Sequence, residues 1–210
     1  MIDSIIFDLD GTLWDTRKET LEAANKVADR YNIDEINEET IESSMGLTDE
    51  EVAEKYIPNE PQEKRFAIFK QMDRENIKYL RSHGGVLYSK VKETLENLSN
   101  KYKLFIVSNC GAGYIESFID YYKFNNLFTD FIAASKENIS KTEAIKRLID
   151  NYNLKNPVYV GDTKGDFEYA QEANILFIHA KYGFCPELET KYKINNFEEL
   201  ESCLESIDYK

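Results

Sequence analysis

Two aspartates, Asp8 and Asp10, follow an apolar run that starts at Ile5. Residues two apart in an extended chain project to the same face, so the two carboxylates should lie side by side. Gly11 follows directly and indicates a turn. Two like charges at the end of a buried strand are unfavourable unless a cation or a proton compensates them. The pair therefore indicates acid–base or metal chemistry, whereas a turn alone would need neither carboxylate.

More polar residues follow the other apolar runs of the chain. Ser108 and Asn109 come after "LFIV", and Asp162 comes after "VYV". Asp166 lies one helical turn beyond Asp162, and Lys141 opens a helical pattern. Ligands of open parallel sheets bind beyond the carboxyl ends of the strands. We therefore expect these side chains to converge at one edge of a sheet.

The elements that must position these residues alternate between strands and helices. Continuous apolar runs predict strands that are buried on both faces, as in a parallel sheet. The five expected strands are residues 4–8, 102–108, 129–134, 157–161 and 175–180. Helical patterns separate them from about residue 88 onward. This order predicts an α/β fold, a doubly wound Rossmann-like parallel sheet with helices on both sides.

The first strand is followed by about seventy residues without a strand pattern, far more than a strand-to-helix connection needs. Apolar residues at helical spacing, from Leu21 to Tyr31 and again after Pro61, predict helices here. The segment "TRKE", residues 16–19, has the pattern of a capping box. We expect residues 15–83 to form an all-helical domain inserted into a core domain made of residues 1–14 and 84–210.

Composition restricts the partners and the location of the protein. The net charge of −13 argues against nucleic acid or an anionic membrane surface as the main partner, but it allows a small anionic substrate. The three cysteines lack metal or redox spacing, which indicates reduced thiols and a cytoplasmic location. We expect no signal peptide, no membrane span, and a monomer or a weak homo-oligomer.

Four motifs occur in one order along the chain: "DLDGT" at residues 8–12, "VSN" at 107–109, Lys141, and "GDTKGD" at 161–166. Together they resemble the haloacid dehalogenase superfamily of hydrolases, in its phosphatase branch with a helical cap of the C1 type. The segment "GLTDEE", residues 46–51, is similar to a loop of phosphoglycolate-phosphatase-like members. The resemblance implies a core domain of that family carrying the inserted helices as its cap.

The resemblance implies a role for each matching acid. Asp8 resembles the family's nucleophile, which would accept the phosphoryl group as an aspartyl-phosphate. Asp10 would protonate the leaving oxygen and later deprotonate water. Mg²⁺ would be bound by Asp8, the backbone carbonyl of Asp10 and Asp162. For Asp166, orienting the water ligands of the ion and a structural role at the start of a helix are equally compatible with the pattern.

Four further residues would contact the phosphoryl group in such an enzyme. Lys141 would supply positive charge, and Ser108, Asn109 and Thr12 would supply hydrogen bonds. The resemblance implies that Lys141 and Ser108 are catalytic residues as well as substrate contacts. The implied function is Mg²⁺-dependent hydrolysis of a small phosphorylated metabolite. The loop at residues 46–48 is the expected determinant of substrate choice.

Other functions fit the pattern less well. Dehalogenases of the superfamily resemble the pattern without the second aspartate, and Asp10 is present here. A phosphomutase of the β-phosphoglucomutase type would use the same residues, although no sugar-clamping arginine pattern follows Gly46. A non-enzymatic phospho-switch or ligand-binding protein would not need Asp10 or the helical insert.

Overall fold

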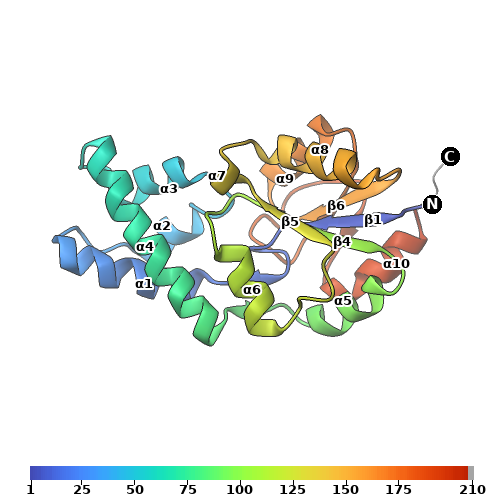
Figure 1. Ribbon diagram of the computed structural model, residues 1–210, viewed down its shortest axis with the longest axis horizontal. Helices are drawn as coiled ribbons and strands as arrows, with labels where there is room; N and C mark the ends of the chain where they lie inside the picture. Colours follow the sequence, from blue (N-terminus) through green and yellow to red (C-terminus); the bar gives the residue numbers. More distant parts are fainter. Residues whose placement is uncertain (208–210) are drawn as a thin grey trace.

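The computed structural model describes residues 1–207, and its centre is a six-stranded parallel sheet (Figure 1). The strand order is β5-β4-β1-β6-β7-β8. The strands are β1 (Ser4–Phe7), β4 (Lys103–Ser108), β5 (Asp130–Ala133), β6 (Pro157–Gly161), β7 (Leu176–Ala180) and β8 (Lys193–Ile194). The first five agree with the predicted strands to within one or two residues. The edge strand β8 was not predicted, because two residues carry no periodicity.

Helices cover both faces of the sheet, which confirms the predicted doubly wound α/β class (Figure 1). One face is covered by α5 (Val91–Ser99), α6 (Tyr114–Tyr122) and α10 (Leu200–Glu205). The other face is covered by α8 (Lys141–Tyr152) and α9 (Lys164–Glu172). Two short helical segments, α7 (Ala134–Glu137) and the 3-10 turn Phe197–Glu199, complete the connections.

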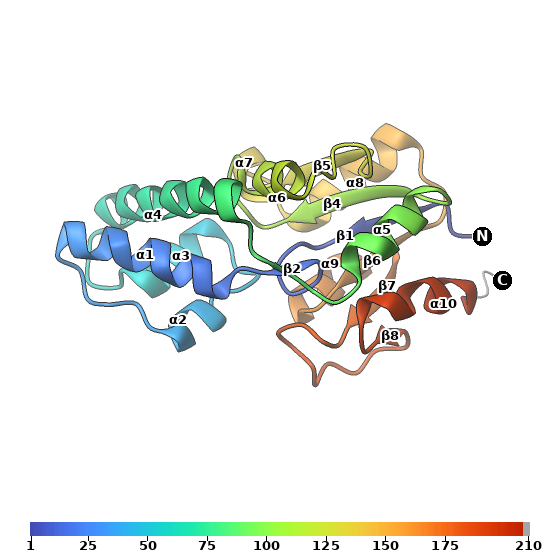
Figure 2. The same cartoon turned by 90° about the horizontal axis from the view of Figure 1, so that it is seen from below.

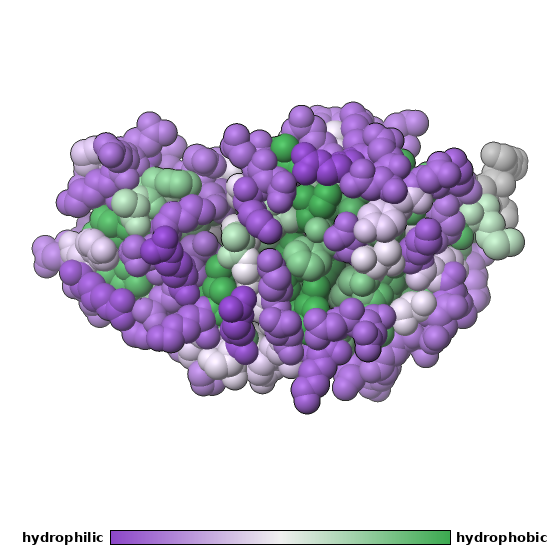
Figure 3. All heavy atoms as spheres, viewed as in Figure 1, coloured by the Kyte–Doolittle hydropathy of each residue, from purple (hydrophilic) through white to green (hydrophobic). Residues whose placement is uncertain are grey.

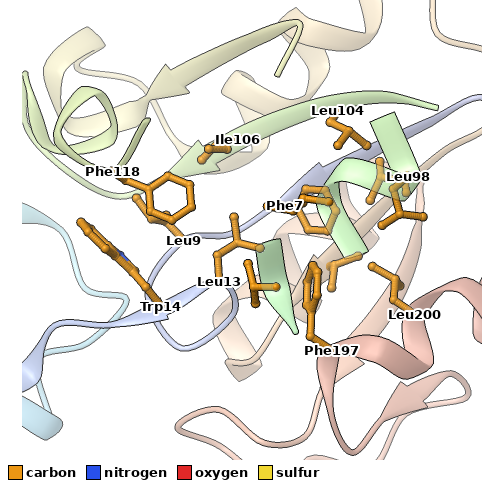
Figure 4. Packing of buried hydrophobic residues seen from close by; sticks show 14 of the residues in the cluster. Phe7, Leu9, Leu13, Trp14, Leu98, Leu104, Ile106, Phe118, Phe197 and Leu200 are labelled. Carbon is orange, nitrogen blue, oxygen red and sulfur yellow. The ribbon is translucent and has the colours of Figure 1, made fainter. Parts of the chain in front are cut away.

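Strand β1 lies in the middle of the sheet, where both of its faces are buried, and this explains its uninterrupted apolar sequence. Ile5 and Phe7 point into the cluster beneath α5 and α10, and Ile6 points into the opposite cluster. All three are fully buried. Figure 4 shows Phe7 packed among the side chains of the first cluster. Burial of one such side chain contributes about 1.5–3 kcal/mol, so a polar residue on either face would destabilise the sheet.

Residues 17–83, where the sequence predicted helices, form four of them. They are α1 (Arg17–Tyr31), α2 (Glu38–Glu42), α3 (Asp49–Tyr56) and α4 (Gln62–His83). Helices α1 and α4 run side by side (Figure 2). These helices enclose an apolar cluster of their own, which includes Val27, Ile41 and Met72. Tyr31 was expected on the apolar stripe but is 47% exposed, because it is the last residue of α1.

Two connections join the helical part to the sheet domain, and they pair with each other. Strand β2 (Trp14–Asp15) is antiparallel to β3 (Val86–Leu87). Trp14 is fully buried here and packs edge-on against Phe118 (Figure 4). The limits of the inserted domain, residues 15–83, stay a prediction, and this paired ribbon lies at both of them.

Two helices beside the strand ends begin with a capping box, whereas α1 lacks the one predicted for it. Ser140 with Glu143, and Thr163 with Asp166, form capping boxes at the starts of α8 and α9. The capping box expected at Thr16 is wrong, because the Thr16 side chain makes no cap hydrogen bond to α1. Its hydroxyl is within hydrogen-bond distance of the Asp10 carboxylate instead.

The surface is largely hydrophilic in the view of Figure 3, where polar residues form the outline of the molecule. Among residues 1–207, no helix combines the length and the apolar character needed to cross a membrane.

Candidate active site

The predicted polar residues meet at the carboxyl end of the sheet, around β1. Phe7, the last residue of β1, pairs in register with Ile106 of β4 and Val160 of β6, so Asp8 follows the end of β1 between these two neighbouring strands. Ser108 ends β4, and Asp162 follows Gly161 at the end of β6. This is the position where open parallel sheets bind ligands.

Lys141 is the buried cation of the cluster. It begins α8, and its Nζ donates to Asp8 Oδ1 at 2.8 Å and to Asp166 Oδ1 at 2.6 Å. Its side chain is only 2% exposed. Burial opposes its charge, but the carboxylates of Asp166 and Asp8 outweigh that effect and raise the pKa of Lys141 well above its usual value. Lys141 therefore stays protonated and bridges Asp8, at the end of β1, and Asp166, in the first turn of α9.

Asp162 is held by groups from two loops. Its Oδ2 accepts from the backbone N–H of Phe184 at 2.7 Å, and its Oδ1 accepts from the Thr12 hydroxyl at 3.3 Å. Gly11 has a φ of +79°, and a Cβ there would collide with the Asp162 carboxylate. The glycine thus allows the loop after β1 to close over Asp162. Thr12 was predicted to contact the substrate, and in the structure its hydroxyl donates to Asp162.

Asp166 is the most firmly fixed of the acids. Its Oδ2 accepts from the backbone N–H of Thr163 at 3.0 Å and from the Thr163 hydroxyl at 2.7 Å. Its Oδ1 accepts from Lys141 and from the Tyr159 hydroxyl, the latter at 3.2 Å. Burial would raise the pKa of Asp166, but Lys141 outweighs it and the pKa is lowered. Asp166 is thus both a helix-capping residue and an ionised neighbour of Asp8.

Three of these acids form a group that could bind a divalent cation. Asp8, Asp162 and Asp166 each offer a carboxylate oxygen, these oxygens lie within 4.8 Å of one another, and all three residues are buried. Burial and the negative charge of Asp166 raise the pKa of Asp8 and of Asp162, and Lys141 offsets this only in part. An all-oxygen set with excess negative charge fits a hard cation such as Mg²⁺.

Asp10 lies apart from Lys141 and has hydroxyl partners. The Tyr114 hydroxyl donates to Asp10 Oδ1 at 2.8 Å, and the Thr16 hydroxyl donates to the same oxygen at 3.0 Å. Burial raises the pKa of Asp10 to about 6, although both hydrogen bonds favour the ionised form. A carboxyl group with this pKa can donate and accept protons near neutral pH.

Asn109 connects the sheet domain to the helical part. Its Nδ2 donates to the backbone carbonyl of Gly46 at 3.0 Å. A Cβ at Gly46 would lie 3.4 Å from the Thr163 methyl group, so the loop at residues 46–48 faces the strand ends. Ser108 is buried beside them, 4% exposed.

The sequence did not indicate Tyr114 or Tyr159 as site residues. The Tyr114 hydroxyl reaches Asp10 from an element distant in the chain, and the Tyr159 hydroxyl reaches Asp166 from the strand just before α9; no motif marks either position. Thr16 was noticed for the wrong reason, as a helix cap. Thr16 follows Trp14 by two residues, and the structure folds this segment back so that the Thr16 hydroxyl reaches Asp10.

The fold and the site together define a class of protein: a parallel α/β sheet with aspartates and a buried lysine at its strand ends, and with helices inserted after the first strand. The family model described as "Haloacid dehalogenase-like hydrolase" matches residues 5–180, and the chain belongs to this family.

Similar proteins agree with this assignment. A phosphoglycolate phosphatase of Aquifex aeolicus (strain VF5) is 26% identical over 186 residues, covering 86% of this chain and 85% of the relative. The crystal structure of a predicted phosphoglycolate phosphatase from Haemophilus somnus 129PT has a TM-score of 0.85 at 21% identity, with 97% and 98% of the chains covered. A haloacid dehalogenase-like family hydrolase from Streptococcus pneumoniae has a TM-score of 0.83, also at 21% identity, with 97% and 98% covered.

Proposed function

We propose that the protein is a Mg²⁺-dependent phosphatase that hydrolyses a small phosphate monoester through an aspartyl-phosphate on Asp8. The observation that carries the proposal is the buried cluster of Asp8, Lys141, Asp162 and Asp166 at the end of β1. The name of the Aquifex aeolicus relative supports the same reaction class.

In the first step, a carboxylate oxygen of Asp8 attacks phosphorus and the ester P–O bond breaks. The leaving alkoxide takes a proton from Asp10, whose raised pKa provides the protonated form. The products are an alcohol and an aspartyl-phosphate. Lys141 Nζ, at 2.8 Å from Asp8 Oδ1, would hold the nucleophile in place and offset the charge of the incoming phosphoryl group.

In the second step, water attacks the phosphorus of the aspartyl-phosphate, and Asp10 accepts a proton from that water. The bond between phosphorus and the Asp8 oxygen breaks, which releases inorganic phosphate and regenerates both carboxyl groups. Ser108 and Asn109 are proposed hydrogen-bond donors to the phosphoryl oxygens. Asn109 would exchange its bond to the Gly46 carbonyl for this one, which would link phosphate binding to the cap loop.

Mg²⁺ would be held by the carboxylates of Asp8 and Asp162 and the backbone carbonyl of Asp10, with Asp166 beside them. When bound, it supplies positive charge that lets a carboxylate approach a phosphate dianion. Hydrolysis of several phosphate esters, followed as phosphate release with Mg²⁺ and with EDTA, tests the proposal. Conversion of a sugar phosphate to its isomer without phosphate release would support a phosphomutase instead.

Removal of the ion should change stability as well as activity. At a Mg²⁺ concentration of about 100 times Kd, binding contributes about 2.7 kcal/mol, which corresponds to a rise in Tm of about 5–10 °C for a chain of this size. Asp162→Asn should lose most of this shift, whereas Asp120→Asn, on the exposed side of α6, should keep it. Thermal unfolding with EDTA and with Mg²⁺ measures both. Equal Tm values, together with full activity in EDTA, would contradict the proposed metal site.

Tyr114 is predicted to position Asp10 as the proton donor. Tyr114→Phe removes one hydrogen bond to Asp10, and we expect kcat/KM for an alkyl phosphate to fall about threefold to tenfold. The decrease should be smaller for p-nitrophenyl phosphate, because p-nitrophenolate leaves without protonation. Tyr152→Phe is a matched control, since the Tyr152 hydroxyl donates to Asp130 at 2.9 Å outside the site. A purely structural role of Tyr114 would lower both rates equally.

A further inference from the structure

A cavity of about 100 Å³ lies between the helical part and the sheet domain, beside Asp10. One wall is apolar and includes Ala24, Val52 and Met72. The other polar groups of the cavity include Asp49, Asp73 and Asn76, all from the helical part. Since Asp10 would protonate the leaving oxygen, the remainder of the leaving group should occupy this cavity.

Two carboxylates of the cavity lie directly over the loop that follows β4. A Cβ at Gly111 would be 2.9 Å from Asp73 Oδ2 and 3.7 Å from Asp49 Oδ2. Asp49 forms an ion pair with Lys70, whereas Asp73 has no ion pair within residues 1–207. Burial and the charge of Asp49 raise the pKa of Asp73 to about 6. Lys70 and Arg74 lower this pKa only in part, so the cavity contains a partly buried carboxylate without an ion-pair partner among the described residues.

Asn76 gives an independent indication of a ligand. Its side chain lines the same cavity, and the residue is only 6% exposed. Its Nδ2 donates to the Thr20 hydroxyl at 3.1 Å, but its Oδ1 has no hydrogen-bond partner in the described part of the chain. A buried acceptor without a hydrogen-bond partner carries a free-energy cost. A donor on a bound molecule would remove this cost.

We propose that the substrate is a phosphate monoester whose leaving group carries an amino group, bound as an ammonium by Asp73 with Asn76 and Asp49. The proposal specifies the substrate class of the proposed phosphatase and rests on that function for the placement of the phosphoryl group. An ammonium supplies both the positive charge and the hydrogen-bond donors that this wall lacks. A carboxylate, as in phosphoglycolate, would face Asp73, and no lysine or arginine lines the cavity in residues 1–207.

The test compares phosphate esters that differ only at the end of the leaving group. Alkyl phosphates of matched length, from two to four carbons, carry a terminal ammonium, hydroxyl or carboxylate. Binding is measured by calorimetry on full-length Asp8→Asn protein with Mg²⁺, so that turnover is not required. At the best chain length, we expect the ammonium ester to bind about tenfold or more tightly than the carboxylate ester, with the hydroxyl ester between them.

The variant Asp73→Asn, combined with Asp8→Asn, should reduce the preference for ammonium over carboxylate about threefold to tenfold. Asp34→Asn removes an exposed carboxylate elsewhere on the helical part and should leave the preference unchanged. Equal or tighter binding of the hydroxyl or carboxylate ester would overturn the inference, as would an unchanged preference in the Asp73 variant.

Hydrolysis by the wild-type protein separates this inference from the proposed function. Absence of phosphate release from every ester, including p-nitrophenyl phosphate, would contradict the phosphatase, while the binding order would still decide the inference. Rapid hydrolysis of p-nitrophenyl phosphate combined with a preference for the carboxylate ester would contradict only the inference.

Discussion

Asp8→Asn is expected to lower kcat for any phosphate ester by about 10⁴-fold or more, because an amide cannot attack phosphorus in place of the carboxylate. Asparagine has nearly the same shape as aspartate, and its Oδ1 can still accept from Lys141. The change therefore removes the nucleophile while it keeps the packing at the end of β1. The measurement is phosphate release at saturating Mg²⁺, with Asp120→Asn as the control.

The same variant should not lose stability. Asp8 is buried beside Asp162 and Asp166, so its negative charge is unfavourable in the metal-free protein. A neutral side chain removes this repulsion, and we expect Tm in EDTA to be unchanged or higher. Loss of activity with retained Tm would distinguish a missing nucleophile from a damaged fold. Activity within tenfold of the wild type would rule out the covalent step on Asp8.

Asp10→Asn is expected to lower kcat for alkyl phosphates by about 10²–10⁴-fold, the usual contribution of a positioned general acid or base. The effect should differ between the two chemical steps. p-Nitrophenolate needs no proton, so p-nitrophenyl phosphate should still transfer its phosphoryl group to Asp8. The second step needs Asp10 to accept a proton from water, and it should become rate-limiting.

A burst of p-nitrophenol, equal to the enzyme concentration and followed by slow turnover, is therefore the expected result for Asp10→Asn. Mass spectrometry of the acid-quenched protein should detect an added phosphoryl group with the aryl ester and little with an alkyl ester. Adding Asp8→Asn should abolish the burst. If no phosphorylated protein accumulates with the aryl ester, the assignment of Asp10 to the second step is wrong.

The sheet and the meeting of the site acids could be predicted because both depend on local rules. The apolar run of β1 requires cover on both faces, and parallel strands place their carboxyl ends at one edge. The alternation of strands and helices along the chain, and the positions of Asp8, Ser108 and Asp162 at the strand ends, follow from these rules. Family resemblance added the roles, which the structure alone does not assign.

The hydrogen-bond partners of the site acids could not be predicted, because they depend on how separate elements of the fold are oriented toward each other. Tyr114 reaches Asp10 from the first turn of α6, and Tyr159 reaches Asp166 from the middle of β6. Thr16 had the pattern of a helix cap, but a tertiary hydrogen bond to Asp10 took its hydroxyl. Likewise, only the packing of α3 and α4 against the loop after β4 places Asp49 and Asp73 over Gly111.

The ribbon formed by β2 and β3 limits how the inserted helices can move. Both covalent crossings between the two parts are tied together by backbone pairing of Trp14–Asp15 with Val86–Leu87, and Trp14 anchors this pair in the sheet domain. If the two connecting segments were not paired, the inserted helices could both twist and slide relative to the sheet domain. Because β2 and β3 are paired, rotation about one axis is the motion that keeps the hydrogen bonds between them. We therefore expect the inserted helices to open and close over the site by rotating about one axis when substrate enters and product leaves, with Gly84 and Gly85 as the hinge.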